Sequence, residues 1–341
     1  MTGETTARLG FLAAVTAFAI AAPLIGDSYI LHVMVLCFIW VIVVSAWDLV
    51  MGYAGIFNFA QLAIFAVGGY ASGMLAIGTG MPPVLAVPLA AVIAGAFGLL
   101  IALPCLRLRG EYVALFTFAV HLALPTLLEK GRAWGTGGAS GLVGVPPIRI
   151  GDLAFTTSNK IGWYYLALAA AAISVWLIYF VVVQGRWGRA FVALRDSEAF
   201  ARSLGIDEYR TKLKLFTLSA AVTGFGGALY AHYVGVMTPR VLGNEFFLMV
   251  MVMLSIGGLG RFPGAIFGAF LVTVGNELLR EAGQYRLLFL GAIVVLVVIL
   301  LPNGVSDLLT RRKKAAAAKN IEIGKADVPT IRSGVNPSCS P

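Results

Sequence analysis

The chain has 341 residues, of which 59% are hydrophobic and only 12% are charged. Soluble domains carry about 25% charged residues, so this composition argues against a water-soluble globular protein. Residues 49–106 form a run of 58 positions without Asp, Glu, Lys or Arg. A helix of that length would measure roughly 87 Å, enough to cross a hydrocarbon layer of about 30 Å at least twice. The composition therefore indicates an all-α, polytopic membrane protein.

Apolar runs of about 17–25 residues predict ten transmembrane helices. In chain order they lie at 9–25, 29–47, 56–78, 82–103, 112–128, 161–183, 215–234, 246–257, 265–279 and 287–301. The eighth and ninth are short, so we expect them to be tilted, or to be half-helices that meet at residues 257–263. Glycines within the runs suit close helix packing in lipid, and these are Gly68, Gly69, Gly73, Gly95, Gly98, Gly224, Gly226 and Gly227.

The distribution of basic residues predicts the topology. Ten spans place both termini on one side, where 18 of the 25 Lys and Arg residues then fall, with seven on the other side. Because basic residues accumulate in cytoplasmic loops, we expect both termini and the loop 184–214 to be cytoplasmic, and the loop 129–160 to be external. The net charge of +9 is then a matter of topology and lipid contact rather than of nucleic-acid binding.

Two regions follow from this pattern. Residues 1–306 are expected to form one transmembrane domain that contains the cytoplasmic loop 184–214. Residues 307–341 form a basic tail with little apolar content and no periodicity that could bury a core. We therefore expect the tail to be cytoplasmic and disordered.

The sequence contains no catalytic or metal-binding constellation. His32, His121 and His232 lack the paired spacing of metal ligands, and we expect each to be a packing residue. The three cysteines form no CxxC motif, and the phosphate-binding motif GxxxxGK[ST] is missing from the sequence. We therefore predict that the chain is not an enzyme, does not hydrolyse ATP itself, and holds neither cofactor nor metal.

An ion-coupled carrier usually has carboxylates inside its helices, because buried charge in a membrane is costly and is kept for ion handling. Glu277, beside Asn276, is the best candidate for this role. The interpretation we favour places Glu277 at the membrane interface near Arg280, where a charge costs little. The energy for transport is then expected to come from elsewhere.

The stretch from Gly52 to Gln61 interrupts the apolar pattern with glycines and amides. Such a break persists at membrane depth where protein or a water-filled cavity satisfies the backbone, so Asn58 and Gln61 are candidate lining residues of a passage. The alternative, which the sequence supports equally, is a tight turn whose amides form hydrogen bonds between helices.

The external loop contains a second candidate for contact with a ligand or with a partner that delivers it. Its glycine-rich stretch begins with Thr136, Gly137 and Gly138, and offers a flexible backbone rich in donors. Ordinary turn chemistry would explain the same residues equally well.

Residues 188–204, with the sequence GRAFVALRDSEAFARSL, predict a short amphipathic helix in the cytoplasmic loop. Its apolar positions include Phe191 and Leu194, and Gly205 stands where a left-handed helix cap is expected. The helix lies between two spans and carries both signs of charge. It could therefore rest on lipid headgroups or insert into a groove of another protein.

At this loop the chain resembles the permease subunits of ATP-binding-cassette importers, whose cytoplasmic loop carries a Glu-Ala-Ala…Gly pattern that docks on the ATPase. The corresponding residues are Glu198, Ala199 and Gly205, with Phe200 in place of the second alanine. Further segments are similar, in order and spacing, to the M-type permeases of branched-chain amino acid importers; these lie at 52–75, 106–120, 136–146, 193–239 and 251–269.

The resemblance implies a permease subunit of the inner membrane that carries leucine, isoleucine or valine. It also implies a heterodimer with a second related permease, two cytoplasmic ATPases and an extracytoplasmic substrate-binding protein. Urea and short-amide importers use similar permeases and are alternatives, as is an ion-coupled carrier or channel that acts alone. The coupling helix implied by the resemblance runs from about Arg189 to Leu204, with Phe191 and Leu194 as apolar anchors and Glu198 as a partner for a basic residue.

Overall fold

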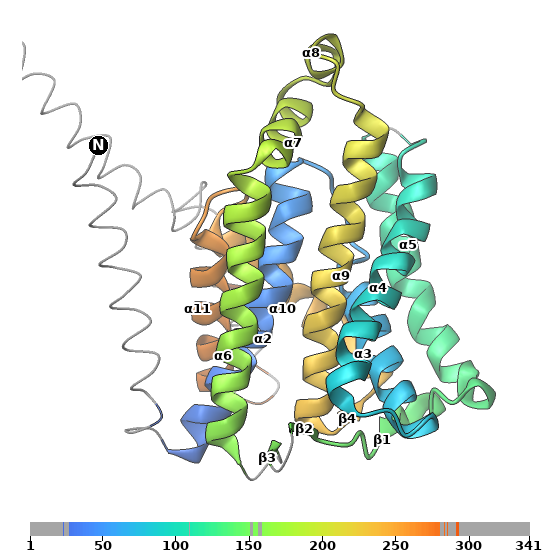
Figure 1. Ribbon diagram of the computed structural model, residues 1–341, viewed down its shortest axis with the longest axis vertical. Coiled ribbons are helices and arrows are strands. Elements are labelled where there is room, and N and C mark those ends of the chain that lie inside the picture. Colours follow the sequence, from blue (N-terminus) through green and yellow to red (C-terminus); the bar gives the residue numbers. More distant parts are fainter. Residues whose placement is uncertain are drawn as a thin grey trace, which may run out of the picture.

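The computed structural model describes residues 27–108, 110–150, 153–155 and 159–279, together with residues 23, 283, 285, 291 and 292. Long helices run side by side in a bundle and dominate this part of the chain (Figure 1). The predicted spans at 9–25 and 287–301 lie almost entirely outside the described residues, as do the two termini and the tail 307–341. The structure therefore supports a polytopic helical membrane protein.

Six helices in the described part of the chain are long and apolar enough to cross a membrane. They are α2 (Ser28–Asp48) with the π-helix η2 (Leu49–Tyr53), α3 (Gln61–Gly78), α4 (Pro83–Cys105), α5 (Glu111–Lys130) with η3 (Gly131–Trp134), α6 (Lys160–Trp176) with the π-helix η5 (Leu177–Val183), and α9 (Glu208–Val234). Two shorter apolar helices follow, α10 (Asn244–Gly257) and α11 (Gly264–Leu278). In order, these eight elements correspond to the second to ninth predicted spans.

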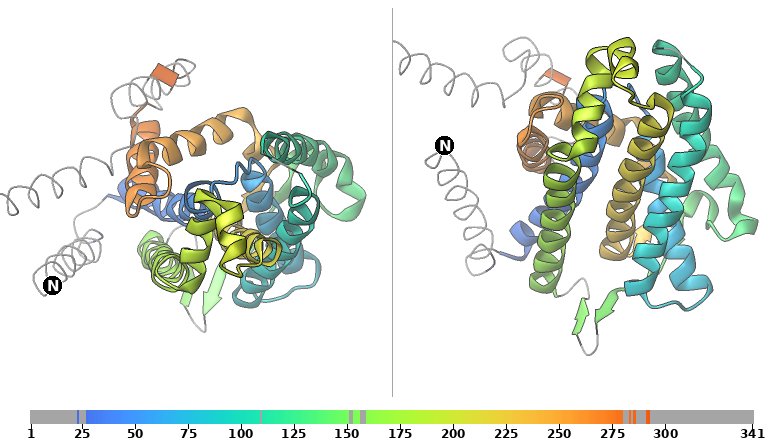
Figure 2. Two further views of the ribbon diagram at one scale, coloured as in Figure 1. Left: turned by 90° about the horizontal axis from the view of Figure 1, so that it is seen from above. Right: turned by 45° about the horizontal axis from the view of Figure 1, so that its top comes forward.

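The helix α9 occupies the middle of the bundle and packs against α2, α3, α4 and α6 (Figures 1 and 2). Its approach to α3 is so close that a Cβ atom on Gly68 would overlap the backbone of Gly224. Similarly, a Cβ atom on Gly98 of α4 would overlap the side chain of Ala220 in α9. Small residues thus allow these backbones to meet, as their recurrence in the apolar runs predicts.

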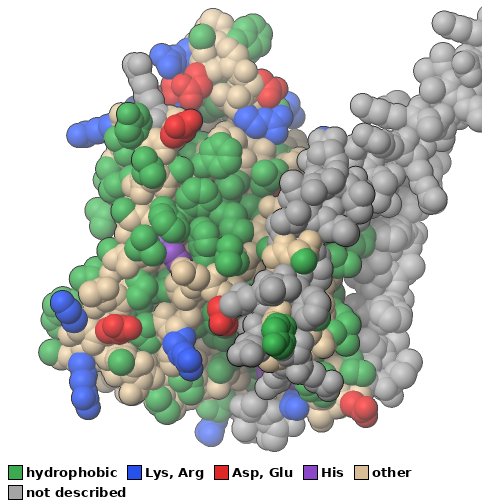
Figure 3. Space-filling model, turned by 180° about the vertical axis from the view of Figure 1, so that it is seen from behind, with side chains coloured by type: hydrophobic (Ala, Val, Ile, Leu, Met, Phe, Trp, Pro, Cys, Tyr) green, Lys and Arg blue, Asp and Glu red, His purple; other side chains and the backbone are tan. Residues whose placement is uncertain are grey.

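The two polar loops lie at opposite ends of the bundle. The helices α7 (Arg186–Asp196) and α8 (Glu198–Ser203) form one end, and all the described strands lie at the other (Figure 1). Strand β1 (Leu142–Val143) pairs antiparallel with β4 (Val236–Met237), and β2 (Ile148–Ile150) pairs antiparallel with β3 (Leu153–Phe155). One face of the molecule shows hydrophobic side chains across its middle and most charged side chains near the two ends (Figure 3). This arrangement is the one expected of a membrane-crossing bundle.

Two predicted boundaries are wrong by several residues. The third span begins at Gln61 rather than at residue 56, because the segment 54–60 is not helical. The seventh span begins at Glu208 rather than at residue 215, because the side chain of Asp207 accepts a hydrogen bond from the backbone N–H of Arg210 and caps the helix. Polar helix ends of this kind extend beyond the apolar run from which spans were predicted.

The short helices α10 and α11 pack against each other and are connected by residues 258–263. A Cβ atom on Gly264 would overlap the carbonyl group of Gly257, so the two helices meet at a glycine contact. In the view from above, α10 is seen along its length whereas α6 and α9 are seen end-on (Figure 2, left). The expectation that this pair is tilted relative to the other spans is therefore confirmed for α10.

Candidate functional site

The segment 54–60 between η2 and α3 is held by a buried network of polar groups. The indole Nε1 of Trp47 donates to the carbonyl oxygen of Asn58 at 2.7 Å. The amide Nδ2 of Asn58 donates to Oε1 of Gln61 at 3.1 Å, and its Oδ1 accepts from the N–H of Ala60 at 3.0 Å. Asn58 is 1% exposed and Gln61 is fully buried. The break in the helix is thus compensated by side chains rather than left unsatisfied.

The same network connects the segment 54–60 to α9 through hydrogen bonds. Nε2 of Gln61 donates to Oγ of Ser219 at 2.9 Å and also to Oγ1 of Thr223, both in α9. The hydroxyl of Ser219 in turn donates to the carbonyl oxygen of Ala46 in α2 at 2.6 Å. The Gln61 amide therefore forms hydrogen bonds between helices, as one of the two interpretations of the sequence proposes, whereas the Asn58 amide bonds only to Ala60 and Gln61 among the described residues. Their role as passage lining stays a prediction.

The glycine-rich stretch after α5 lies at the other end of the bundle from α7 and α8. The hydroxyl of Thr136 donates to the carbonyl oxygen of Leu128 at 2.7 Å, and the N–H of Gly138 donates to the Thr136 hydroxyl at 3.4 Å. Gly137 and Gly138 have φ angles of 76° and 67°, a region that favours glycine. These contacts are those of a compact turn.

The structure does not bring the two groups of predicted passage residues together. Gln61 is the first residue of α3, whereas Gly73, twelve positions later, lies against Leu142 in the loop that contains Thr136. At about 1.5 Å per residue, twelve residues of helix separate the two levels by roughly 18 Å. Any passage that touched both groups would cross more than half of the membrane.

The predicted single helix from Arg189 to Leu204 is wrong. The segment consists of two helices, α7 and α8, separated at Ser197, which has extended backbone angles of φ −161° and ψ 111°. The Ser197 hydroxyl accepts a hydrogen bond from the N–H of Phe200 and caps α8. Serine competes in this way for backbone donors, which is why it favours helix starts over helix interiors.

The apolar residues of this segment divide into two groups. Phe191 and Leu194 of α7 are 2% and 4% exposed, so they are buried within this chain rather than available as anchors for another protein. By contrast, Phe200 of α8 and the adjacent Leu204 are each 62% exposed at the tip of the bundle. Periodicity marks all of these residues as apolar, but only the tertiary structure separates the buried ones from the exposed ones.

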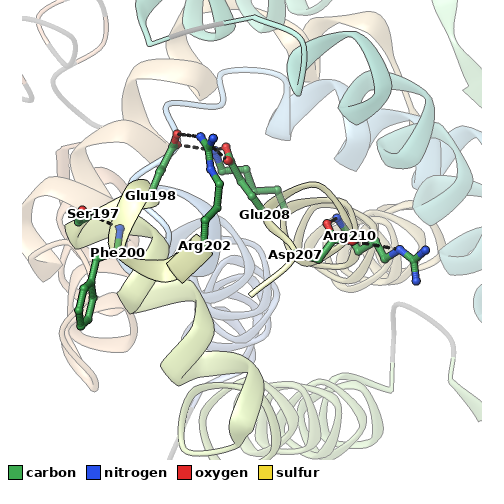
Figure 4. Close-up of polar contacts among 8 residues, drawn as sticks. Ser197, Glu198, Phe200, Arg202, Asp207, Glu208 and Arg210 are labelled. Atoms are coloured by element: carbon green, nitrogen blue, oxygen red, sulfur yellow. Dashed lines mark hydrogen bonds and ion pairs between the residues drawn. The ribbon is translucent and has the colours of Figure 1, made fainter. Parts of the chain in front are cut away.

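Glu198 belongs to a network of charges that joins α8 to the start of α9 (Figure 4). Lys212 lies 2.6 Å from a carboxylate oxygen of Glu198 and 2.6 Å from one of Glu208. Arg202 lies 3.0 Å from Glu208 and 3.7 Å from Glu198. Exposed ion pairs are weak one by one, but several that share partners restrain one another. Glu198 is therefore partnered within this chain, whereas Ala199 beside it is exposed.

Gly205 adopts the left-handed conformation that its place after the amphipathic pattern predicts, with φ 81°. The N–H of Gly205 donates to the carbonyl oxygen of Arg202 at 3.0 Å, and the N–H of Ile206 donates to that of Ala201 at 3.1 Å. These bonds satisfy carbonyl groups at the end of α8.

A contact that sequence reasoning missed joins α7 to the membrane bundle. Nη1 of Arg195 donates to the carbonyl oxygen of Gly52 in η2 at 3.0 Å. One turn earlier, the buried carboxyl group of Asp48 accepts from the N–H of Gly260, in the connection between α10 and α11, at 2.7 Å. The sequence offers one indication that Asp48 has a special role, because it is the last charged residue before the uncharged run 49–106. Its partner, however, is 212 positions away.

Glu277 lies at the end of α11, where its carboxylate accepts a hydrogen bond from the hydroxyl of Tyr29 at 2.7 Å. Tyr29 is the second residue of α2, at the same end of the bundle, and is 52% exposed. The position agrees with the interfacial interpretation of Glu277 rather than with an ion site in the middle of the membrane.

Comparisons with known proteins show which proteins this chain is similar to. A family model described as the permease component of the branched-chain amino acid transport system matches residues 29–298. The high-affinity branched-chain amino acid transport system permease protein LivM of Escherichia coli K12 is 30% identical over 323 residues, covering 89% of this chain and 76% of that relative.

More distant relatives include a second type of permease and a permease for another solute. LivH of Escherichia coli K12, also a high-affinity branched-chain amino acid transport system permease protein, is 24% identical, covering 78% of this chain and 90% of its own. The autoinducer 2 import system permease protein LsrC of Klebsiella pneumoniae is 28% identical, covering 68% and 66%. No solved structure matches the chain. The chain belongs to the family of branched-chain amino acid transport system permease components.

Proposed function

We propose that this chain is the M-type permease subunit of an ATP-driven importer that moves leucine, isoleucine and valine across the inner membrane. The observation that carries the proposal is the 30% identity to LivM over 89% of this chain. The helical bundle, with six described spans and two short apolar helices, supports the role of a membrane passage. The chain itself is not expected to hydrolyse ATP.

The proposed assembly contains a second related permease, two cytoplasmic ATPases and an extracytoplasmic substrate-binding protein. The similarity of this chain to both LivM and LivH supports the second permease, since both relatives are permease proteins of the high-affinity branched-chain amino acid transport system. The ATPases and the binding protein follow from the family and from the lack of a nucleotide motif in this sequence.

The end of the bundle formed by α7 and α8 is proposed as the docking site for an ATPase. Phe200 and Leu204 offer exposed apolar area, and Ala199 beside Phe200 leaves room for close approach. Phe191 and Leu194 have a structural role instead, because they are buried and pack α7 against the bundle. Glu198 and Gly205 set the direction of α8, the first through the charge network and the second through its left-handed conformation.

The passage is proposed to pass beside the segment 54–60. Asn58 and Gln61 hold this non-helical segment in place, and irregular backbone in membrane proteins borders cavities when it is not buried in protein. Thr136, Gly137 and Gly138, at the opposite end, are proposed to meet the solute as it arrives from the binding protein.

Reconstitution of the whole complex in liposomes tests the proposal. We expect uptake of radiolabelled leucine that requires ATP, the binding protein and this chain together. A complex that lacks this chain is the control and should show only background uptake. ATP-independent uptake by this chain alone would favour the carrier or channel alternative. Accumulation of urea or a short amide without any branched-chain amino acid would reassign the solute.

A further inference from the structure

His121 is the histidine whose ring has no hydrogen-bond partner among the described residues. It is 1% exposed, and neither Nδ1 nor Nε2 is satisfied. His232, in contrast, contacts the hydroxyl of Ser72 at 2.8 Å and the carbonyl oxygen of Pro146 at 2.7 Å. Burying a polar group without a hydrogen-bond partner is unfavourable, and most buried polar groups in proteins have one. His121 therefore calls for an explanation that His232 does not need.

The position of His121 is the middle of a membrane-spanning helix. It lies ten residues after Glu111 and nine before Lys130, the two ends of α5. At about 1.5 Å per residue, this places it roughly 14–15 Å from either end. Sites for carried solutes in transporters lie near this level, beside interrupted helices.

Two phenylalanines contact the His121 ring, and a third, from another segment, contacts both of them. Phe247 of α10 has its ring centroid 5.0 Å from that of His121, and Phe118 lies 6.2 Å away on α5. Phe59, from the non-helical segment 54–60, lies 5.9 Å from Phe247 and 6.2 Å from Phe118. We call these four residues the aromatic cluster. Each phenylalanine in it is only half-buried, whereas the histidine is buried.

The aromatic cluster is joined directly to the break in the helix. The N–H of Phe59 donates to Oγ1 of Thr117, the residue before Phe118 in α5, at 3.0 Å. Phe247 also contacts Trp47, with ring centroids 6.3 Å apart, and Trp47 donates to the carbonyl oxygen of Asn58. A movement of the segment 54–60 would therefore move one wall of the cluster relative to α5.

We propose that the aromatic cluster is a solute-contact site in the passage, with His121 as its polar group and a zwitterionic amino acid with an apolar side chain as its occupant. Small-molecule sites combine mostly apolar walls with a few polar groups that set orientation. A neutral imidazole has one N–H that can donate to the carboxylate, and phenyl faces attract an ammonium group. The phenylalanines also suit an aliphatic side chain. The proposal rests on the proposed function, which supplies the class of solute.

The test compares three variants in the reconstituted complex, with leucine as the probe. His121→Phe keeps a ring but removes both nitrogens, and we expect leucine uptake at least tenfold below wild type, with ATP hydrolysis within twofold. His121→Gln restores a donor and an acceptor, and should keep at least a third of the uptake. Tyr70→Phe is the control, since it also removes a buried polar atom that has no partner among the residues the structure describes, but lies outside the cluster. Uptake by His121→Phe within twofold of wild type would overturn the proposal.

A second measurement keeps the test decisive if His121→Phe does not assemble. Cys37, Cys105 and Cys339 are replaced by alanine, and His121→Cys is then exposed to a small thiol reagent. We expect labelling that rises with ATP and binding protein and is slowed by leucine. No labelling in any state would place His121 outside the passage and overturn the proposal. If the wild-type complex does not transport leucine, the proposed function is wrong. If labelling of His121→Cys is then slowed by another solute that the complex transports, the cluster is a solute-contact site, but its proposed occupant, an amino acid, is wrong.

Discussion

Arg195 of α7 donates a hydrogen bond from Nη1 to the carbonyl oxygen of Gly52 at 3.0 Å, across 143 positions of the chain. The acceptor lies in η2, directly before the non-helical segment 54–60. The aliphatic part of the Arg195 side chain also approaches Gly55, the second residue of that segment. Arg195 therefore connects the helix proposed to meet the ATPase with the segment proposed to border the passage.

Replacement of Arg195 by alanine is expected to weaken this connection. A hydrogen bond to a charged group contributes about 1.5–3 kcal/mol when shielded from water and less at this half-exposed position. We expect leucine uptake to fall about tenfold while the complex keeps its ATPases, measured by uptake per ATP hydrolysed. Arg189→Ala on the same helix is the control, because the bond of Arg189 within the described part of the chain is local, to the carbonyl oxygen of Gln184. Equal effects of both variants would contradict the link.

Gly52→Ala is expected to destabilise the bundle itself. A Cβ atom there would overlap Oδ1 of Asp48 and the backbone of Gly260, so the bond between those two groups would be displaced. Overpacking of this kind costs about 1–3 kcal/mol. Thermal unfolding of the purified protein in detergent measures the loss. Gly78→Ala is the matched control, since a Cβ atom there would contact nothing within 4 Å; a similar loss there would show that the packing at Gly52 is not the cause.

Glu198→Lys is expected to separate ATP hydrolysis from uptake. The change places a third cation beside Lys212 and Arg202, and like charges within this network repel. Glu198→Gln removes the attraction only and should have a smaller effect. We expect uptake per ATP to drop several-fold for Lys, and the swap Glu198→Lys with Lys212→Glu to restore part of it. No difference between Lys and Gln would argue against a role of the charge network in coupling.

Gly205→Val tests the turn that follows α8. A Cβ atom at Gly205 would meet nothing within 4 Å, so the expected cost comes from φ 81° and not from a clash. A residue with a Cβ atom pays about 1–2 kcal/mol in this conformation, and a β-branched residue pays at the upper end. Valine should therefore reduce co-purification of the ATPases, and Gly205→Asn should retain most of it. Full retention with valine would mean that the direction of α8 is unimportant.

Cysteines placed at Ser140 and Ser197 should be labelled from opposite sides of the membrane. Ser140 belongs to η4 (Gly138–Ser140) in the loop 129–160, and Ser197 separates α7 from α8. The basic residues predict that Ser197 is cytoplasmic, since seven of them lie between Arg186 and Lys214. Impermeant thiol reagents applied to intact cells and to inverted vesicles decide the matter. Labelling of both sites from one side would contradict the predicted topology.

Composition and periodicity were enough to predict most of the bundle. A run of 58 uncharged residues is far longer than one strand of a barrel, and helices satisfy most of its backbone groups internally, as lipid requires. The left-handed helix cap at Gly205 was also predictable, because glycine is the residue that most easily adopts this conformation. Both inferences depend on neighbours in the sequence.

The roles of the individual apolar and polar residues were decided by the tertiary structure. Phe191 and Phe200 are equally hydrophobic, yet one is 2% exposed and the other 62%, because Ser197 ends one helix and starts another between them. Among the histidines, His232 has two partners from distant segments and His121 has none among the described residues. A hydrogen bond requires two groups within about 3 Å. His232 and its partners are 86 and 160 positions apart, so only the folded chain sets that distance.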